Sequence, residues 1–317
     1  MMAFNILTEK VPEPQVLNWR ARRELNPGPT GFEAALQGNL RFTELLNDLN
    51  GFYDFLLVDC QKSHSTARDY RAIVKRFLES GEGEVTVDVV RDYLKRIKEK
   101  CSRDHYAITL SALKLFFRDY KRRPDIIETF KFPPKTFKPK RIPTKEDLKR
   151  FYNALPSIRM KAYFLLTASS GLRKSEVLGL TVEDVDFEKR MLKPHNHKGT
   201  TKHTWVSFYN QEAEDVLKKF RASLTEKQRK SNKLIPISSR DFKIEWRLAQ
   251  QKTGLKLTSR SLRDWFAEEM GRLGVADRYI DSLQGRTPAS ILARHYTDYH
   301  PDKLKEIYDK AGLTILT

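Results

Sequence analysis

Three arginines lie in sequence patterns that could bind a phosphate group. Arg173 comes just after Gly171, which interrupts an apolar stretch that begins at Tyr163, and helical spacing resumes at Glu176. This pattern predicts a helix, a glycine break and a short helix, which would hold Arg173 on a rigid, partly buried turn. Such an arginine is either half of a structural ion pair, here with Glu176, or a clamp for a phosphate or carboxylate.

The other two arginines, Arg260 and Arg263, follow the helix-capping stretch Leu257 to Ser259. A spacing of three residues puts both guanidinium groups on one face of the expected helix. Two adjacent guanidinium groups repel each other unless an anion lies between them. The pair therefore favours a phosphate site over a purely structural role.

Both arginine patterns resemble motifs of the tyrosine recombinases, the phage integrase family. Residues 170–180 with Asp184-Val185-Asp186 are similar to the first arginine box of that family, in which T-G-L-R precedes a glutamate, a leucine pair and D-I-D. Residues 260–267 are similar to the second box, H-x-L-R-H-T-F-A, with Arg260 and Asp264 in place of its two histidines. The chain resembles in particular the integrases of archaeal viruses and plasmids.

The resemblance implies the remaining site residues. Residues 198–206 fit the lysine hairpin of the family with one extra residue, which makes Lys198 the catalytic lysine. Residues 279–286 resemble the motif V-I-Q-E-L-L-G-H, with Arg286 at the position of a histidine or tryptophan. The nucleophile is then Tyr296, ten residues beyond Arg286, and Tyr299 is the alternative.

The chemistry that the resemblance implies is cleavage and rejoining of DNA through a 3′-phosphotyrosyl intermediate. Tyr296 would attack the phosphodiester, because a covalent intermediate splits one difficult step into two. Lys198 would protonate the leaving 5′-oxygen. Four arginines would stabilise charge in the transition state: Arg173 and Arg263 directly, with Arg260 and Arg286 assisting.

We expect no metal and no cofactor. His195, His197 and His203 have a spacing that could bind zinc, but no cysteine or carboxylate cluster nearby completes a site. Cys60 and Cys101 form neither a metal-ligand spacing nor a disulfide framework.

Composition points to a polyanionic partner. The 317 residues carry a formal net charge of +18, and 39% of them are apolar, enough for two folded domains. We find no apolar run of membrane-spanning length and no signal-peptide pattern, so we expect an intracellular protein without a membrane role. Double-stranded DNA is the expected partner. The resemblance implies a homo-tetramer on DNA, with a monomer or dimer free in solution.

The hydrophobic pattern divides the chain into four segments. We expect a mainly α fold with a small antiparallel β-hairpin or sheet in the catalytic domain, arranged as the two-domain, C-shaped clamp of tyrosine recombinases. The segments are a basic arm (1–47), a helical core-binding domain (48–122), a basic proline-rich linker (123–143) and a catalytic domain with a C-terminal tail helix (144–317).

The linker is either a solvated connection or a strap along a phosphate backbone. Its candidate DNA-binding residues are Lys131, Lys135, Lys138, Lys140 and Arg141.

The basic arm carries a further hypothesis about the target. Residues 23–27 can be encoded by CGG-GAA-TTG-AAC-CCG, whose reverse complement contains GGTTCAATTCC and looks like a tRNA T-arm. Integrases of some archaeal viruses and plasmids carry their attachment site in their own gene. The resemblance therefore suggests integration or excision of a mobile element at a tRNA gene.

Three other functions compete with this interpretation. A type IB topoisomerase uses the same chemistry to relax DNA. A catalytically impaired relative would bind a DNA sequence without cutting it. The loss of the family's histidines at the positions of Arg260 and Arg286 favours that alternative. A generic RNA-binding protein would leave the ordered motifs unexplained.

Overall fold

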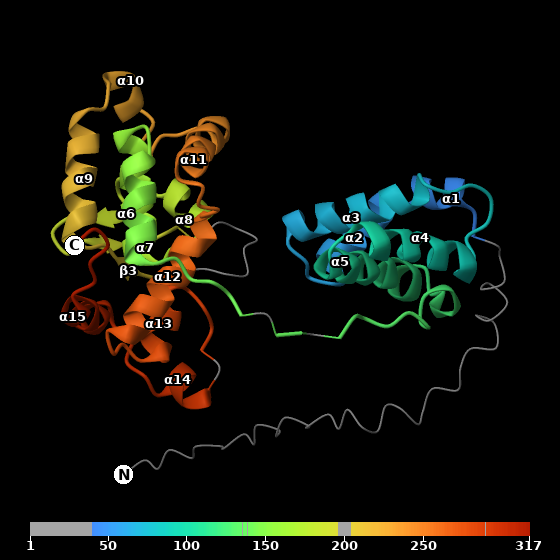
Figure 1. Cartoon of the computed structure of the whole chain (residues 1–317). Helices are drawn as coiled ribbons and strands as arrows, with labels where there is room; N and C mark the ends of the chain where they lie inside the picture. Colours follow the sequence, from blue (N-terminus) through green and yellow to red (C-terminus); the bar gives the residue numbers. More distant parts are fainter. Residues whose placement is uncertain (1–39, 135, 138, 196–203, 289) are drawn as a thin grey trace, which may run out of the picture. The chain divides into compact units, whose positions relative to one another are not determined.

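The computed structural model describes residues 40–134, 136–137, 139–195, 204–288 and 290–317. The chain divides into two compact units, Met1–Lys135 and Thr136–Thr317. Both are mainly helical, and the only strands among the described residues form one small antiparallel sheet in the second unit, so the expected fold class is confirmed (Figure 1). None of the described helices is both long and apolar enough to cross a bilayer.

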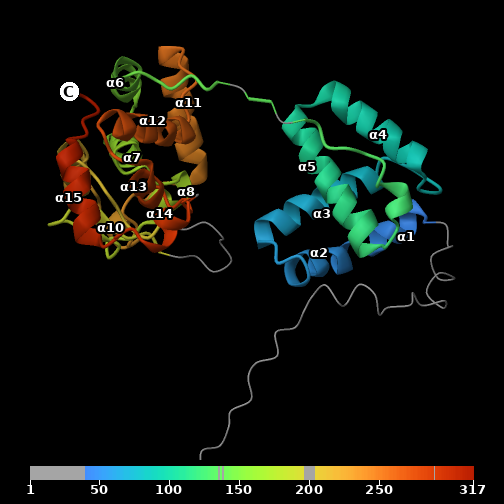
Figure 2. The ribbon, with the colours of Figure 1, turned by 90° about the horizontal axis from the view of Figure 1, so that it is seen from below.

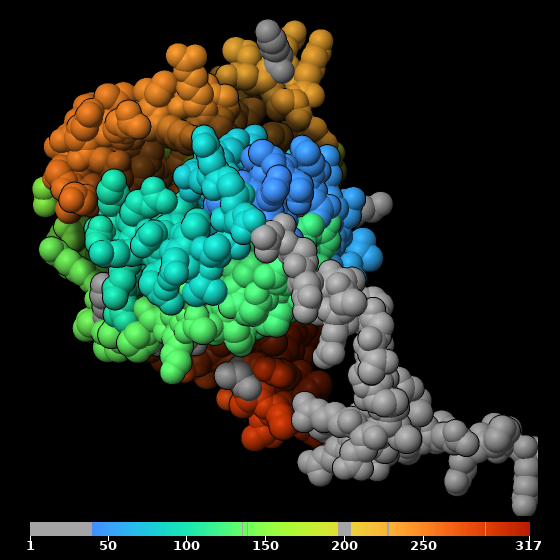
Figure 3. Space-filling view, turned by 90° about the vertical axis from the view of Figure 1, so that its right-hand side faces the viewer, coloured from blue at the N-terminus to red at the C-terminus, as the bar shows by residue number. Residues whose placement is uncertain are grey.

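The first unit is a helical bundle whose blue-to-green residues form one continuous packed surface (Figure 3). Its core contains the fully buried rings of Phe52, Phe77, Phe116 and Phe117. The elements are α1 (Phe42–Asn47), α2 (Leu49–Val58), α3 (His64–Leu78), α4 (Val87–Lys100), α5 (Arg103–Lys114), the π-helical turn η3 (Leu115–Tyr120) and the 3-10 turn η4 (Pro124–Ile126).

Helix α1 begins inside the segment that the sequence pattern assigned to the basic arm. The ring of Phe42 is buried against Phe77, with 5.5 Å between the ring centroids. A Cβ atom at Gly81 would lie 2.4 Å from Phe42, so this glycine makes room for the ring. The folded unit thus includes residues before 48, because two buried side chains, Phe42 and Leu45, suffice to anchor a single short helix.

The second unit is built around α7 (Ile158–Ser170), which is buried on nearly all sides and packs against α9 and α12. Figure 2 shows α7 beside α12. A helix that is apolar all round belongs in a core. The other helices are α6 (Lys145–Ala154), α8 (Lys174–Gly179), α9 (Gln211–Ala222), α10 (Glu226–Arg229), α11 (Ser239–Thr253), α12 (Ser259–Arg272), α13 (Asp277–Leu283), α14 (Ile291–His295) and α15 (Pro301–Ala311).

The sheet runs β1 (Val185–Asp186), β2 (Met191–Leu192) and β3 (Ser207–Phe208) in that order. Met191 pairs with Asp186 on one side and with Phe208 on the other. The sequence predicted the hairpin between residues 191 and 208, and β1 adds a third strand to it. The sheet fixes the chain on both sides of residues 196–203, which carry the expected catalytic lysine and lie outside the described residues.

The C-terminal tail packs on its own unit. Leu313 and Ile315 are buried, and the backbone amides of Ile315, Leu316 and Thr317 donate to the carboxylate of Glu212 at 2.7–3.1 Å.

Candidate active site

Arg173 is held on the turn between α7 and α8. Gly171 ends α7 with a left-handed backbone (φ +63°), and a Cβ atom there would lie 2.4 Å from Cδ1 of Phe266 on α12. Only glycine allows both this conformation and this close approach. The expected pattern of helix, glycine break and short helix is confirmed.

The guanidinium of Arg173 has partners from three parts of the unit. Its Nη1 donates to Oε1 of Glu176 at 2.8 Å, and its backbone amide donates to Oε2 of the same carboxylate at 2.7 Å. Its Nη2 donates to the carbonyl oxygen of Gly285 at 3.0 Å, and Oγ1 of Thr204 lies 3.5 Å from Nη1. The sequence offered an ion pair and an anion clamp as alternatives. Because Arg173 lines a cavity while it is paired with Glu176, the side chain can make the ion pair and bind an anion at the same time.

Arg263 on α12 is almost fully buried, with 9% of its surface exposed. Its Nη1 donates to the carbonyl oxygen of Gly171 at 2.6 Å, and its Nη2 donates to that of Gln284 at 2.5 Å. Burial, followed by the nearby charge of Arg173, lowers the pKa of Arg263 to about 10. The group stays protonated at neutral pH, and because both of these partners are neutral carbonyls, a bound anion would relieve the cost of burying its charge.

Arg260 and Arg286 are held far more loosely. Their side chains are 78% and 43% exposed, and each has a carboxylate only at a distance: Asp264 at 3.9 Å from Arg260 and Asp281 at 3.6 Å from Arg286. The same Asp264 also contacts Lys140 at 3.3 Å. These two arginines can follow a ligand, but they are not positioned in advance.

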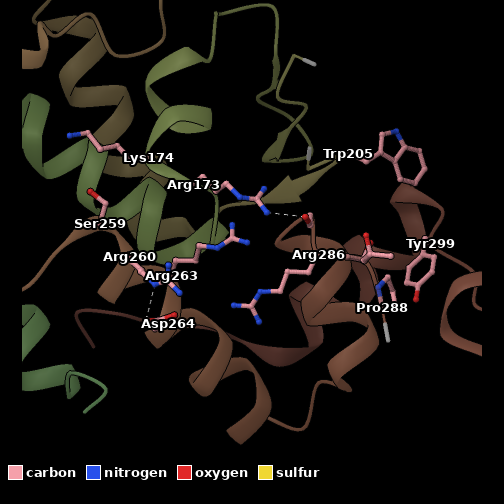
Figure 4. A pocket seen from close by; sticks show the side chains of 13 residues that line it. Arg173, Lys174, Trp205, Ser259, Arg260, Arg263, Asp264, Arg286, Pro288 and Tyr299 are labelled. Atoms are coloured by element: carbon pink, nitrogen blue, oxygen red, sulfur yellow. Dashed lines mark hydrogen bonds and ion pairs between the residues drawn. The ribbon is translucent and has the colours of Figure 1, made fainter. Parts of the chain in front are cut away.

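All four arginines line one open cavity of about 870 Å³, called the arginine cavity below (Figure 4). Five of its lining residues are cations and one is a carboxylate, so its field attracts anions. The complete lining is Arg173, Lys174, Trp205, Ser259, Arg260, Arg263, Asp264, Ser282, Gly285, Arg286, Thr287, Pro288 and Tyr299.

The two candidate nucleophiles differ in position. Tyr296 directly follows α14, is 78% exposed and is not part of the cavity lining. Tyr299 lines the cavity, but its hydroxyl donates to the carbonyl oxygen of Ala293 and its ring packs on Tyr279. In this arrangement neither hydroxyl is both free and inside the cavity.

Of the predicted basic residues outside the cavity, three lie among the described residues and three do not. Lys131 lines a small pocket of the first unit, Lys140 pairs with Asp264, and Arg141 is exposed. Lys135, Lys138 and the catalytic candidate Lys198 lie outside the described residues, as do His197 and His203. The ring of His195 contacts the carboxylate of Asp184.

Sequence reasoning missed several lining residues, among them Lys174, Trp205 and Ser259. Lys174 stacks its ammonium 3.5 Å from the centre of the Phe242 ring, and burial together with Lys243 lowers its pKa. The sequence signal for a role of Lys174 in the site was that it directly follows Arg173. Trp205 lies in the stretch 198–206 that the sequence assigns to the lysine hairpin, and its exposure is visible only in the folded chain.

Comparison with known proteins gives a consistent result. Residues 141–303 match the sequence profile of the phage integrase family, and residues 49–123 match that of the phage integrase N-terminal SAM-like domain. Tyrosine recombinase XerA of Pyrococcus horikoshii is 31% identical over 80% of this chain and 89% of its own length. Tyrosine recombinase XerA of Pyrococcus furiosus is 29% identical over 80% of this chain and 90% of its own length.

Solved structures agree at the level of the fold. A lambda integrase tetramer bound to a Holliday junction aligns with a TM-score of 0.63 at 14% identity, covering 89% of this chain and 87% of that one. The Tn1549 transposon integrase, in complex with transposon right end DNA, aligns with a TM-score of 0.60 at 16% identity, covering 86% of this chain and all of that one.

Proposed function

The chain belongs to the phage integrase family and is a tyrosine-type site-specific recombinase, and we propose that its arginine cavity binds the scissile phosphate of double-stranded DNA. The observation that carries this proposal is the convergence of Arg173, Arg260, Arg263 and Arg286, from three separate stretches of sequence, on one cavity. Like charges gather in this way when an anion is the ligand.

Arg173 and Arg263 bind the non-bridging oxygens and stabilise the charge of the pentacoordinate transition state. Glu176 and the carbonyl oxygens of Gly171, Gln284 and Gly285 hold these two side chains in place before DNA arrives. Such preorganisation costs no rearrangement at the moment of reaction. Arg260 and Arg286 close on the phosphate from the exposed rim.

The oxygen of Tyr296 attacks the phosphorus and its phenolic proton passes to solvent water. The bond from phosphorus to the 5′-oxygen breaks, and the 3′ side of the cut strand becomes a phosphotyrosyl ester. The leaving 5′-oxygen takes a proton from Lys198. Because the ester conserves the energy of the phosphodiester, the 5′-hydroxyl of a partner strand can attack it and reseal the DNA without ATP.

Tyr296 must move to react, and its surroundings support this. Helix α14 has five residues and only Ala293 buried, while its Ile291 and Leu292 are exposed. A segment with so little buried surface opens at low cost. Binding of DNA brings Tyr296 either to the cavity of its own chain or to that of a neighbouring protomer.

The first unit and the linker supply further contacts with the DNA backbone, the latter through Lys131, Lys135, Lys138, Lys140 and Arg141. The solved lambda integrase is a tetramer on a Holliday junction, and we infer that four copies of this chain exchange strands between two duplexes. The biological outcome is integration or excision of a mobile element, and a tRNA gene is the candidate target.

A suicide substrate tests the proposal. A nicked duplex that carries the tRNA-like sequence is incubated with the protein in EDTA, and covalent protein–DNA is measured beside Tyr296→Phe and Tyr299→Phe. We expect an adduct that only Tyr296→Phe abolishes. Tight binding without an adduct on any duplex would favour a DNA-binding relative, and relaxation of supercoils without strand exchange would favour a topoisomerase.

A further inference from the structure

Trp205 is the largest side chain that the arginine cavity leaves exposed. It is 54% exposed, whereas the other described tryptophans, Trp246 and Trp265, are buried in the core of the second unit. Leaving an indole in water forgoes a large burial energy, so an exposed one beside a functional cavity calls for a ligand.

The backbone presents Trp205 rigidly. Its neighbours Thr204 and Val206 are buried, so Trp205 points to the opposite side of the extended chain. The amide of Thr204 donates to Oε1 of Glu176 at 3.2 Å, and Oγ of Ser207 donates to the carbonyl oxygen of Ser170 at 2.6 Å. The carboxylate that holds Arg173 thus also holds the backbone next to Trp205.

Trp205 and Tyr299 lie on one side of the cavity, and Lys174 and Ser259 lie on the other, with the arginines between them (Figure 4). The ring of Tyr299 already packs on Tyr279, with the centroids 6.2 Å apart. Among the described residues, no aromatic ring packs on Trp205. One side of a phosphate-binding cavity therefore carries a flat apolar surface with a free face.

The reaction itself supplies a matching group. To exchange strands, the bases next to the cut must leave their complementary strand, which exposes their faces. Base faces stack on aromatic side chains whatever the sequence. Resting on the proposed function, we propose that Trp205 stacks on the unpaired base of a nucleotide next to the scissile phosphate and positions the free 5′-hydroxyl strand for joining.

The test separates cleavage from joining. Covalent adduct is first formed on a suicide substrate, and a 5′-hydroxyl strand is then added and the joined product timed. We expect Trp205→Ala to slow joining about 5- to 100-fold, the range for loss of one base stack. Trp205→Phe should stay within about threefold of the parent because it keeps an aromatic face. Phe187→Ala, which removes a half-exposed ring outside the cavity, is the matched control and should join normally.

An abasic scan identifies the partner and excludes a merely structural role. Joining strands that lack one base at each of the first three positions are compared in parent and Trp205→Ala. At one position, removal of the base should slow the parent to the rate of the variant and leave the variant unchanged. Equal joining by parent and Trp205→Ala, or a Trp205→Ala deficit that persists at every abasic position, would overturn the proposal. If the parent forms no adduct, the proposed function itself fails instead.

Fluorescence gives an independent check that does not need joining. The emission of Trp205 is the difference between the parent and Trp205→Phe. Addition of the cleaved-site duplex should quench that difference, because a stacked base quenches indole emission. An unchanged difference at saturating DNA would contradict stacking.

Discussion

The arginine cavity contains two kinds of arginine. Arg173 and Arg263 are tied to Glu176 and to three backbone carbonyls, and Arg263 is almost completely buried. Arg260 and Arg286 are largely exposed, with carboxylates no nearer than 3.6 Å. We call the first pair tethered arginines and the second pair mobile arginines, and the difference lies in what holds the side chain. Under the proposed function, the tethered pair is the preorganised part of the transition-state site and the mobile pair supplies charge at its rim.

The largest effect should come from Arg263→Lys. Lysine keeps the positive charge, but its single nitrogen cannot occupy the places of both Nη1 and Nη2, which donate to the carbonyl oxygens of Gly171 and Gln284. We expect the cleavage rate on a suicide substrate to fall about 10³-fold, the upper range for loss of one preorganised donor. Binding of intact duplex, measured by gel shift, should change little. Cleavage within tenfold of the parent would show that charge alone matters here.

The next test disturbs the turn at Gly171, which precedes Arg173 and whose carbonyl oxygen accepts from Arg263. Gly171→Ala places a Cβ atom in a left-handed backbone and against Phe266, so the α7–α12 interface must open. We expect the free energy of unfolding in urea to fall by about 2–4 kcal/mol, from backbone strain and overpacking. Gly254→Ala is the control: its φ is +71°, but nothing lies within 4 Å of a Cβ there. Equal destabilisation of the two variants would exclude the Phe266 clash as a cause.

Glu176→Gln should have an intermediate effect. The amide keeps the shape but loses the charge that holds Arg173 and the amide of Thr204. We expect cleavage to slow about 10- to 100-fold, since a loosened group loses orientation rather than charge. Asp264→Asn, at the exposed Arg260, is the paired change and should slow cleavage less than about threefold. If the two variants lost activity equally, the distinction between tethered and mobile arginines would fail.

The smallest effects should come from Arg260→Ala and Arg286→Ala. Each removes an exposed cation that acts on DNA mainly as a charge. We expect about tenfold weaker binding and a slope of log K against log salt that is shallower by about 1 for each phosphate that the variant no longer neutralises. A decrease in cleavage rate at saturating DNA as large as that of Arg263→Lys would place both residues in the transition-state site.

Much of this organisation could be predicted from local signals. Thr86, Thr144 and Thr258 cap helices, which is a local effect because a side-chain hydroxyl satisfies a free backbone amide within three residues. The C-terminal tail helix expected from the sequence is present as α15. The Arg173 turn was predictable for the same reason, since glycine at the end of an apolar helix is a local signal.

The tertiary structure decided which arginines are buried and which are exposed. Arg260 and Arg263 share a helix face, yet one is exposed and the other buried, because only Arg263 points toward the ends of α7 and α13. Nothing in the sequence showed that Trp205 would face the cavity or that Tyr296 would lie outside it.

The sequence by itself therefore determined the helices and their caps, since these depend on neighbours in the chain. The order and spacing of its motifs also indicated the family and the set of candidate arginines. Three features depend on segments that are far apart in the chain, such as those of Gly171 and Gln284. They are the burial of Arg263, the sharing of Glu176 between Arg173 and Thr204, and the two sides of the cavity. Only folding brings these segments together. The difference between a tethered and a mobile arginine arises from those contacts, because they decide how many partners hold each guanidinium group.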